Sequence, residues 1–149
     1  MAEVLFYHLD RSALEAVLPQ LLEKTLERGW KAVVRTGSDE RLRALDAHLW
    51  TYRDDSFLPH GPAGHDTDVH QPVLLTTGTA NPAGANVLFA VDGAAPDGLD
   101  AYQRCVLMFD GRDNDAVTAA RGYWKTVSAA GHDVTYWQQN EAGRWEKKA

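Results

Sequence analysis

Histidines and carboxylates gather in a segment where they could bind a metal ion. His60, His65 and His70 alternate there with Asp66 and Asp68, and all five are side-chain types that can ligate transition metals. Their spacing matches no common zinc pattern, and no cysteine accompanies them. We therefore expect no metal site in this segment.

A second acidic segment, residues 110–115, follows an apolar run and precedes a helical pattern, which is where α/β proteins place their active sites. Asp110 and Asp113, with the loop histidines, would suit a nucleotide- or metal-dependent hydrolase. The same carboxylates are also ordinary caps for a helix that begins there. The chain has no glycine-rich phosphate loop, Walker lysine motif or serine nucleophile elbow. We therefore expect a non-enzymatic protein with no catalytic residues and no cofactor, and keep the hydrolase as the alternative.

The last predicted helix, residues 113–130, combines an apolar face with two cations. At about 100° per residue, its core face gathers Ala116, Ala120, Tyr123, Val127 and Ala130. Val117 and Trp124 fall at the edge of that face, and Arg121 and Lys125 lie one turn apart just beyond it. Such a ledge would suit a peptide with apolar side chains and a terminal carboxylate. Two solvated cations beside a partly buried tryptophan remain the alternative.

Another apolar cluster lies at the end of the second predicted helix and in the segment that follows it. It consists of Leu49, Trp50, Phe57, Leu58 and Pro59. Large aromatic side chains beside a segment that contains proline often anchor a partner protein. The same side chains could instead cap the core, and the pattern alone leaves both possibilities open.

Composition limits the classes of partner. The chain has 149 residues, which suggests a single domain over residues 1–149. Its 15 Lys and Arg against 21 Asp and Glu give a formal net charge of −6, so we expect it to meet DNA only indirectly. A single cysteine, Cys105, allows no disulfide within the chain, which fits a reducing cytoplasm. Cys105 lies in an apolar run, which predicts a buried strand residue. No apolar stretch approaches the length of a membrane span.

Strand-like and helix-like segments alternate along the chain. Strands are predicted at residues 4–7, 31–35, 73–75, 87–91, 106–109 and 134–137, and helices at 12–28, 38–50 and 113–130. Ser12 and Ser38 are the expected caps of the first two helices. Pro19 either kinks the first helix or delays its regular part. Residues 51–71 read as a long loop and 141–149 as a polar tail, so we expect an α/β fold with an open, mostly parallel sheet flanked by helices.

Several ordered stretches together resemble the chi subunits of bacterial DNA polymerase III. They are Phe6-Tyr7-His8-Leu9, Leu49-Trp50, Ser56-Phe57-Leu58-Pro59-His60, Gln71-Pro72-Val73, Val91-Asp92-Gly93, Phe109-Asp110-Gly111, and Arg121 with Trp124-Lys125. The resemblance spans nearly the whole chain in order. It implies a Rossmann-like sheet without nucleotide chemistry, in an accessory subunit of the clamp-loader complex.

The resemblance also implies partners. Arg121, Trp124 and Lys125 match the positions with which the family binds the acidic, carboxylate-terminated tail of single-stranded DNA-binding protein, and Val117 lies beside them. Trp50, Phe57 and Pro59 correspond to a surface for a second partner, the psi subunit or a helicase-like protein. Two features depart from the family pattern. Trp124 stands where some relatives have tyrosine, and Gly122 interrupts the helix at a cost of about 1 kcal/mol.

Overall fold

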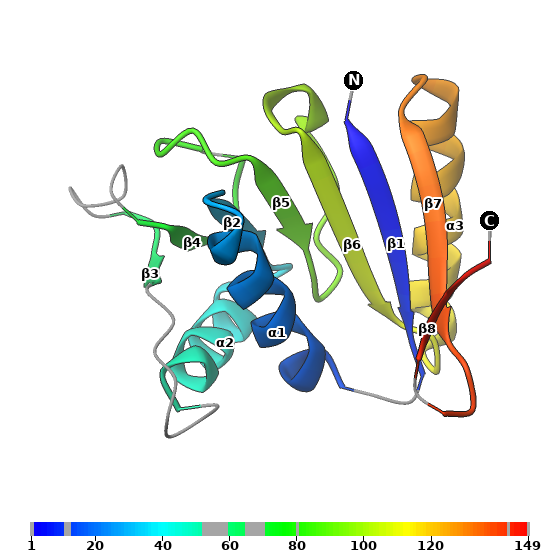
Figure 1. Cartoon of the computed structure of the whole chain (residues 1–149), viewed down its shortest axis with the longest axis horizontal. Coiled ribbons are helices and arrows are strands. Elements are labelled where there is room, and N and C mark those ends of the chain that lie inside the picture. The colour runs from blue at the N-terminus through cyan, green and yellow to red at the C-terminus, as the bar shows by residue number, and fades with distance from the viewer. Residues whose placement is uncertain are drawn as a thin grey trace.

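The computed structural model describes residues 2–10, 13–51, 60–64, 71–79, 81–142 and 144–148. Within these residues, eight strands form one open sheet in the order β3-β4-β2-β5-β6-β1-β7-β8 (Figure 1). Every pairing is parallel except that of β7 with β8. The predicted α/β fold with an open, mostly parallel sheet is therefore confirmed.

The elements have the following bounds. The strands are β1 (Glu3–Leu9), β2 (Ala32–Arg35), β3 (Gly61–Pro62), β4 (Val73–Thr76), β5 (Val87–Ala90), β6 (Arg104–Asp110), β7 (Asp133–Gln139) and β8 (Trp145–Lys147). The helices are α1 (Leu14–Glu27), α2 (Asp39–Thr51) and α3 (Asn114–Ala129), with a short 3-10 helix, η2 (Leu99–Ala101).

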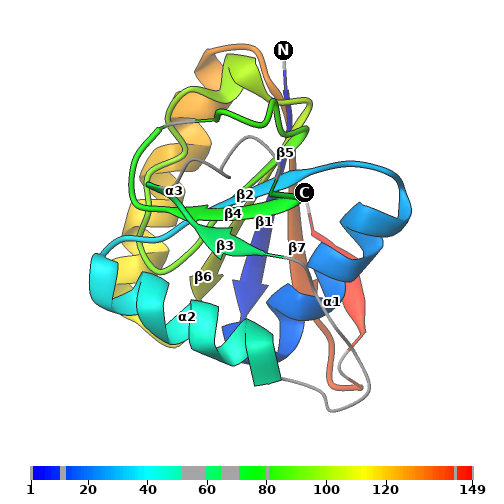
Figure 2. The same cartoon turned by 90° about the vertical axis from the view of Figure 1, so that its left-hand side faces the viewer.

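The helices cover opposite faces of the sheet. On one face α1 contacts β2 and β6 while α2 contacts β3 and β4; on the other face α3 contacts β6 and β7 (Figures 1 and 2). Two apolar cores result, one on each face. The central strands are buried from both sides, which is why they read in the sequence as continuous apolar runs and not as alternating patterns.

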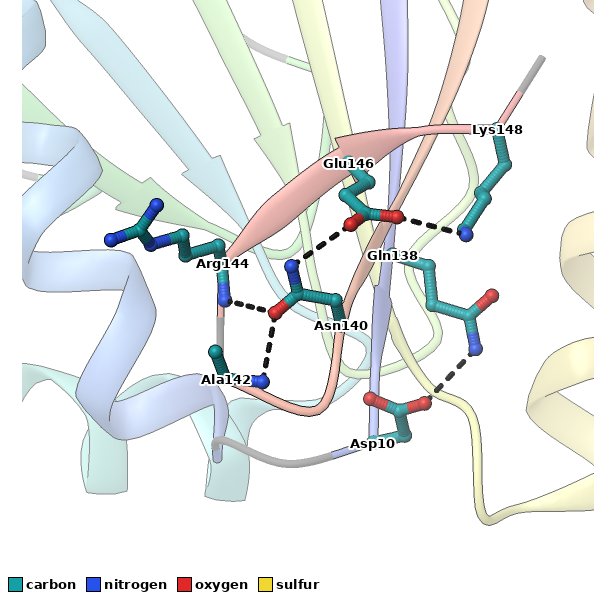
Figure 3. Close-up of polar contacts among 7 residues, drawn as sticks. All are labelled: Asp10, Gln138, Asn140, Ala142, Arg144, Glu146 and Lys148. Atoms are coloured by element: carbon teal, nitrogen blue, oxygen red, sulfur yellow. Dashed lines mark hydrogen bonds and ion pairs between the residues drawn. The ribbon is translucent and has the colours of Figure 1, made fainter.

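Three short elements, β3, η2 and β8, were not predicted from the sequence. The strand β8 lies inside the expected polar tail and pairs antiparallel with β7. The turn between them is held by the Asn140 side chain, which accepts hydrogen bonds from the backbone N–H groups of Ala142 and Arg144 at 2.9 and 3.0 Å (Figure 3). Trp145 anchors the strand by packing its ring 4.8 Å from that of Tyr7. A three-residue strand with charged side chains has too little apolar pattern to be predicted.

The starts of the first two helices differ in how they are capped. The Ser38 hydroxyl accepts a hydrogen bond from the Arg41 N–H at 3.2 Å, so its predicted capping role is confirmed. The helix α1 begins at Leu14, and Ala13 occupies the cap position without a side-chain hydrogen bond. The prediction that Ser12 caps α1 is therefore wrong.

The helix α1 continues through Pro19, so its regular part does not begin after the proline. Proline has no N–H to donate to the carbonyl four residues earlier, which here belongs to Glu15. His48 of α2 takes over this role, because its Nε2 lies 2.7 Å from the Glu15 carbonyl oxygen. Nearby, Arg41 bridges the carboxylates of Glu15 and Asp92 at 2.8 and 3.1 Å. These contacts fix α1 against α2.

The contact between His48 and the Glu15 carbonyl leads to a prediction about stability. Replacing His48→Phe keeps a ring but removes the donor, so the free energy of unfolding should fall by about 1–2 kcal/mol. In a Pro19→Ala background residue 19 donates its own N–H to that carbonyl, and the same change should cost less. Urea unfolding of the four proteins measures the difference. Equal losses in both backgrounds would show that His48 does not compensate for the proline.

Candidate functional site

The helix α3 begins and ends as its sequence predicts. The Asp113 carboxylate caps it by accepting hydrogen bonds from the N–H groups of Asp115 and Ala116, at 3.0 and 3.4 Å. At the other end Gly131 adopts a left-handed conformation with φ of 86°, which lets the chain turn into β7. Because both ends are fixed, the side chains between them keep a defined orientation relative to the sheet.

The core face of α3 is largely the one predicted. Ala120 and Val127 are buried, while Ala116 and Tyr123 are half-buried against the same core. Ala130 was also expected on this face but is exposed, because it lies beyond the last residue of the helix.

Trp124 is a partly buried edge residue, as the helical wheel predicted. Its ring centroid lies 5.3 Å from that of Phe6 in β1 and 5.9 Å from that of Tyr136 in β7, both in edge-to-face arrangements. Val117, which precedes Trp124 by about two helical turns, packs against the same core. The apolar part of the ledge is thus supported by the sheet from below.

Arg121 and Lys125 are exposed beside this apolar edge. Among the residues that the structure describes, neither forms an ion pair with a carboxylate. We call Val117, Arg121, Trp124 and Lys125 together the α3 surface. It joins an apolar ledge to two cations with free charge, in a chain whose net charge is −6.

Sequence reasoning missed two residues beside the α3 surface, Tyr136 and His8. The Tyr136 hydroxyl lies 2.5 Å from His8 Nδ1, and both rings also pack against Phe109. Burial raises the pKa of Tyr136, and the nearby Arg121 guanidinium opposes that rise. The sequence did carry a signal for both residues. Successive side chains of a strand point to opposite faces of the sheet, so every second side chain of β1 and β7 faces α3.

The second predicted cluster is described only in part. Trp50 is 54% exposed, the one large apolar side chain in the described ranges with such exposure, and its ring lies 4.7 Å from that of His60. His60 itself is buried, with Nε2 3.2 Å from the Asp46 carbonyl oxygen. Phe57 and Pro59 lie outside the described residues. Since Trp50 belongs to α2, it is separated from the α3 surface by the sheet (Figure 2).

A cavity of about 650 Å³ opens at the carboxyl ends of β1, β5 and β6, where the hydrolase alternative would place its chemistry. Asp113, on its wall, is engaged as the cap of α3. The Arg112 backbone N–H and guanidinium hold the pKa of Asp110 below its usual value, so this carboxylate stays ionised and is a poor proton donor. Both carboxylates therefore have structural partners.

Other groups considered for chemistry have equally ordinary surroundings. Within the described ranges no three His, Cys, Asp or Glu side chains are arranged to hold a metal ion. The other loop histidines, His65 and His70, lie outside those ranges. Cys105 is buried in β6, as predicted, and burial raises the pKa of its thiol to about 12, which makes it unreactive. No described helix is long and apolar enough to cross a membrane.

Comparison with known proteins gives consistent matches. The family model described as "DNA polymerase III chi subunit, HolC" matches residues 1–135. "Probable DNA polymerase III subunit chi" of Rickettsia prowazekii (strain Madrid E) is 22% identical over 156 residues, covering 100% of this chain and 93% of that protein. "DNA polymerase III subunit chi" of Pseudomonas aeruginosa is 32% identical over 81 residues, covering 52% of this chain and 56% of that protein.

The packing of Trp124 predicts that its loss affects folding as well as any ligand. Trp124→Ala should lower the free energy of unfolding by about 2 kcal/mol, because it removes a half-buried ring from between Phe6 and Tyr136. Arg121→Ala should change it by no more than about 0.5 kcal/mol, since the guanidinium is exposed. Urea unfolding followed by circular dichroism tests both variants. Equal stability of Trp124→Ala and the unchanged protein would contradict this packing.

Proposed function

Because the chain belongs to the family of DNA polymerase III chi subunits, we propose that its α3 surface binds the acidic, carboxylate-terminated tail of single-stranded DNA-binding protein. In doing so it links that protein to the clamp-loader complex, as a non-catalytic accessory subunit. The observation that carries this proposal is the pair of exposed cations, Arg121 and Lys125, beside the supported apolar edge of Trp124.

The chemistry of the α3 surface suits such a tail. An apolar side chain near the peptide's end covers Val117 and Trp124, while the terminal carboxylate meets a cation. Arg121 can hold a carboxylate through two parallel hydrogen bonds, whereas Lys125 acts as a point charge. Since both cations are exposed and lack a carboxylate partner among the described residues, neither has to break an ion pair before it binds.

Contact with DNA is indirect in this proposal. A net charge of −6 opposes binding to phosphates, and only a local group of cations offsets it. The tail of single-stranded DNA-binding protein is a peptide, so a small cationic surface is enough to recognise it. The protein would thus reach DNA through its partner.

A second partner is proposed for the surface around Trp50, together with Phe57 and Pro59. An exposed tryptophan is unusual on a protein surface, and tryptophan is enriched among the residues that dominate binding energy. The partner implied by the family is the psi subunit or a helicase-like protein. Trp50 itself lies in α2, on the face of the sheet opposite to α3, so both partners can bind at once.

Binding of the tail should depend on charge. A peptide with the last residues of single-stranded DNA-binding protein should lose roughly ten- to a hundredfold in affinity on Arg121→Ala or Lys125→Ala, since one charge-assisted contact is worth about 1.5–3 kcal/mol. Lys125→Glu should be worse because it also repels an acidic peptide. Added salt and amidation of the peptide's C-terminus should weaken binding as well.

Calorimetric titration measures these affinities, and Lys24→Glu is the matched control. Lys24 is also an exposed helical lysine, but it lies in α1 on the other side of the sheet. The two Lys→Glu variants therefore differ only in where the same change of charge is made. If the amidated peptide bound as well as the free acid, or if both variants behaved alike, the tail would bind elsewhere.

The two proposed surfaces should act independently. Trp50→Ala should leave the affinity for the tail peptide unchanged, because α2, which carries Trp50, and α3 cover opposite faces of the sheet. We expect the same of Phe57→Ala, because the family resemblance assigns Phe57 to the second-partner surface. The same variants should weaken capture of the psi subunit or a helicase-like protein in a pull-down. A folded Trp50→Ala protein that failed to bind the tail peptide would rule out the separation of the two surfaces.

A further inference from the structure

Tyr136 lies beside the α3 surface, just past the residues 1–135 that the family model matches. In β7 it pairs with Phe6 of β1, and its side chain faces α3, where its ring packs 5.9 Å from that of Trp124. Just past the end of β8, the Lys148 N–H donates to the Tyr136 carbonyl at 2.7 Å, which holds this part of β7 in place. The Tyr136 ring is thus a fixed wall of the α3 surface.

The hydroxyl of Tyr136 is held as firmly as its ring. It lies 2.5 Å from His8 Nδ1, and the imidazole of His8 packs edge-on against Phe109 at 5.1 Å between ring centroids. On its other side this imidazole is so close to Gly111 that a Cβ atom there would collide with it. His8 therefore has little freedom to turn away from Tyr136.

One proton between these two groups decides what the hydroxyl can offer to a ligand. When His8 carries its proton on Nε2, the Tyr136 hydroxyl donates to Nδ1 and its own hydrogen is occupied. When Nδ1 is protonated, His8 donates to the phenolic oxygen, and the hydroxyl hydrogen is free for another acceptor. Burial raises the pKa of Tyr136, so the hydroxyl keeps its hydrogen at neutral pH in either arrangement.

We propose that Tyr136 is a further ligand-binding residue of the α3 surface, which donates its hydroxyl hydrogen to a carboxylate of the bound acidic tail beside Arg121 while His8 donates to the phenolic oxygen. This rests on the proposed function, since it requires the tail to lie on α3. Tyr136 can donate to the ligand only while His8 carries its hydrogen on Nδ1 and donates to the phenolic oxygen.

The charged groups around this pair are of both signs. On the ligand side Arg121 of α3 favours an incoming carboxylate. The ion pair between Glu146 of β8 and Lys148 just past it, with its atoms 3.1 Å apart, adds no net charge. Asp10 follows β1 and accepts a hydrogen bond from Gln138 at 3.0 Å (Figure 3). Asp110 of β6 lies close enough to His8 for the two to interact electrostatically.

The test is calorimetric titration of the tail peptide into Tyr136→Phe. Phenylalanine keeps the ring that packs on Trp124 and removes only the hydroxyl. We expect about tenfold weaker binding than in the unchanged protein, because one hydrogen bond to a charged group is lost. Tyr7→Phe, which alters a tyrosine on the opposite face of β1, is the matched control and should bind normally.

Two further variants separate the possible failures. His8→Phe removes the competing acceptor for the Tyr136 hydroxyl, so it should bind the tail peptide at least as tightly as the unchanged protein does, whereas a merely structural role for His8 would weaken binding. If Tyr136→Phe bound the peptide as the unchanged protein does while Arg121→Ala weakened it, this inference would fail and the proposed function would stand. If Arg121→Ala had no effect, the tail-binding site itself would be misplaced.

Discussion

The parallel pairing of β1 with β6 is the constraint on which the rest of the structure depends. All seven residues of β1, from Glu3 to Leu9, pair with β6 on one edge, and most of them pair with β7 on the other. A strand so enclosed must bury both faces, and it sends Phe6 and His8 toward α3 but Tyr7 and Leu9 toward α1. Each face then needs its own layer of helices. The position of Trp124 over Phe6 follows from this register.

Local charge, more than net charge, makes an acidic protein suitable for an acidic ligand. The net charge is −6, but several carboxylates are already paired, as where Arg41 bridges Glu15 and Asp92. Repulsion between separated surface charges is screened over about 8–10 Å at cellular salt. Arg121 and Lys125, which keep their charge unpaired within the described ranges, act at contact distance. Repulsion elsewhere on the surface would then favour a single mode of binding over many.

How much could be predicted from the sequence depends on whether a feature is local or tertiary. The apolar runs identified the longer strands, and Asp113 with Gly131 identified both ends of α3, because these signals lie within a few residues. The placement of Tyr136 beside Trp124 and His8 depends on the register between β1 and β7, which no local pattern specifies. The same holds for His48, whose contact with the Glu15 carbonyl matters only because Pro19 lies in the other helix. The short strand β8 was missed for lack of apolar residues.

An adaptor of the proposed kind has different structural needs from an enzyme of the same fold. An enzyme would use the cavity at the carboxyl ends of the strands, where its reactive groups must converge and titrate. Here the carboxylates at that edge are engaged in holding helices and turns, as Asp113 does for α3. An adaptor needs surfaces far enough apart for two partners to bind without collision. The helices α2 and α3, on opposite faces of a rigid sheet, provide that separation, and the sheet itself needs only to hold them in place.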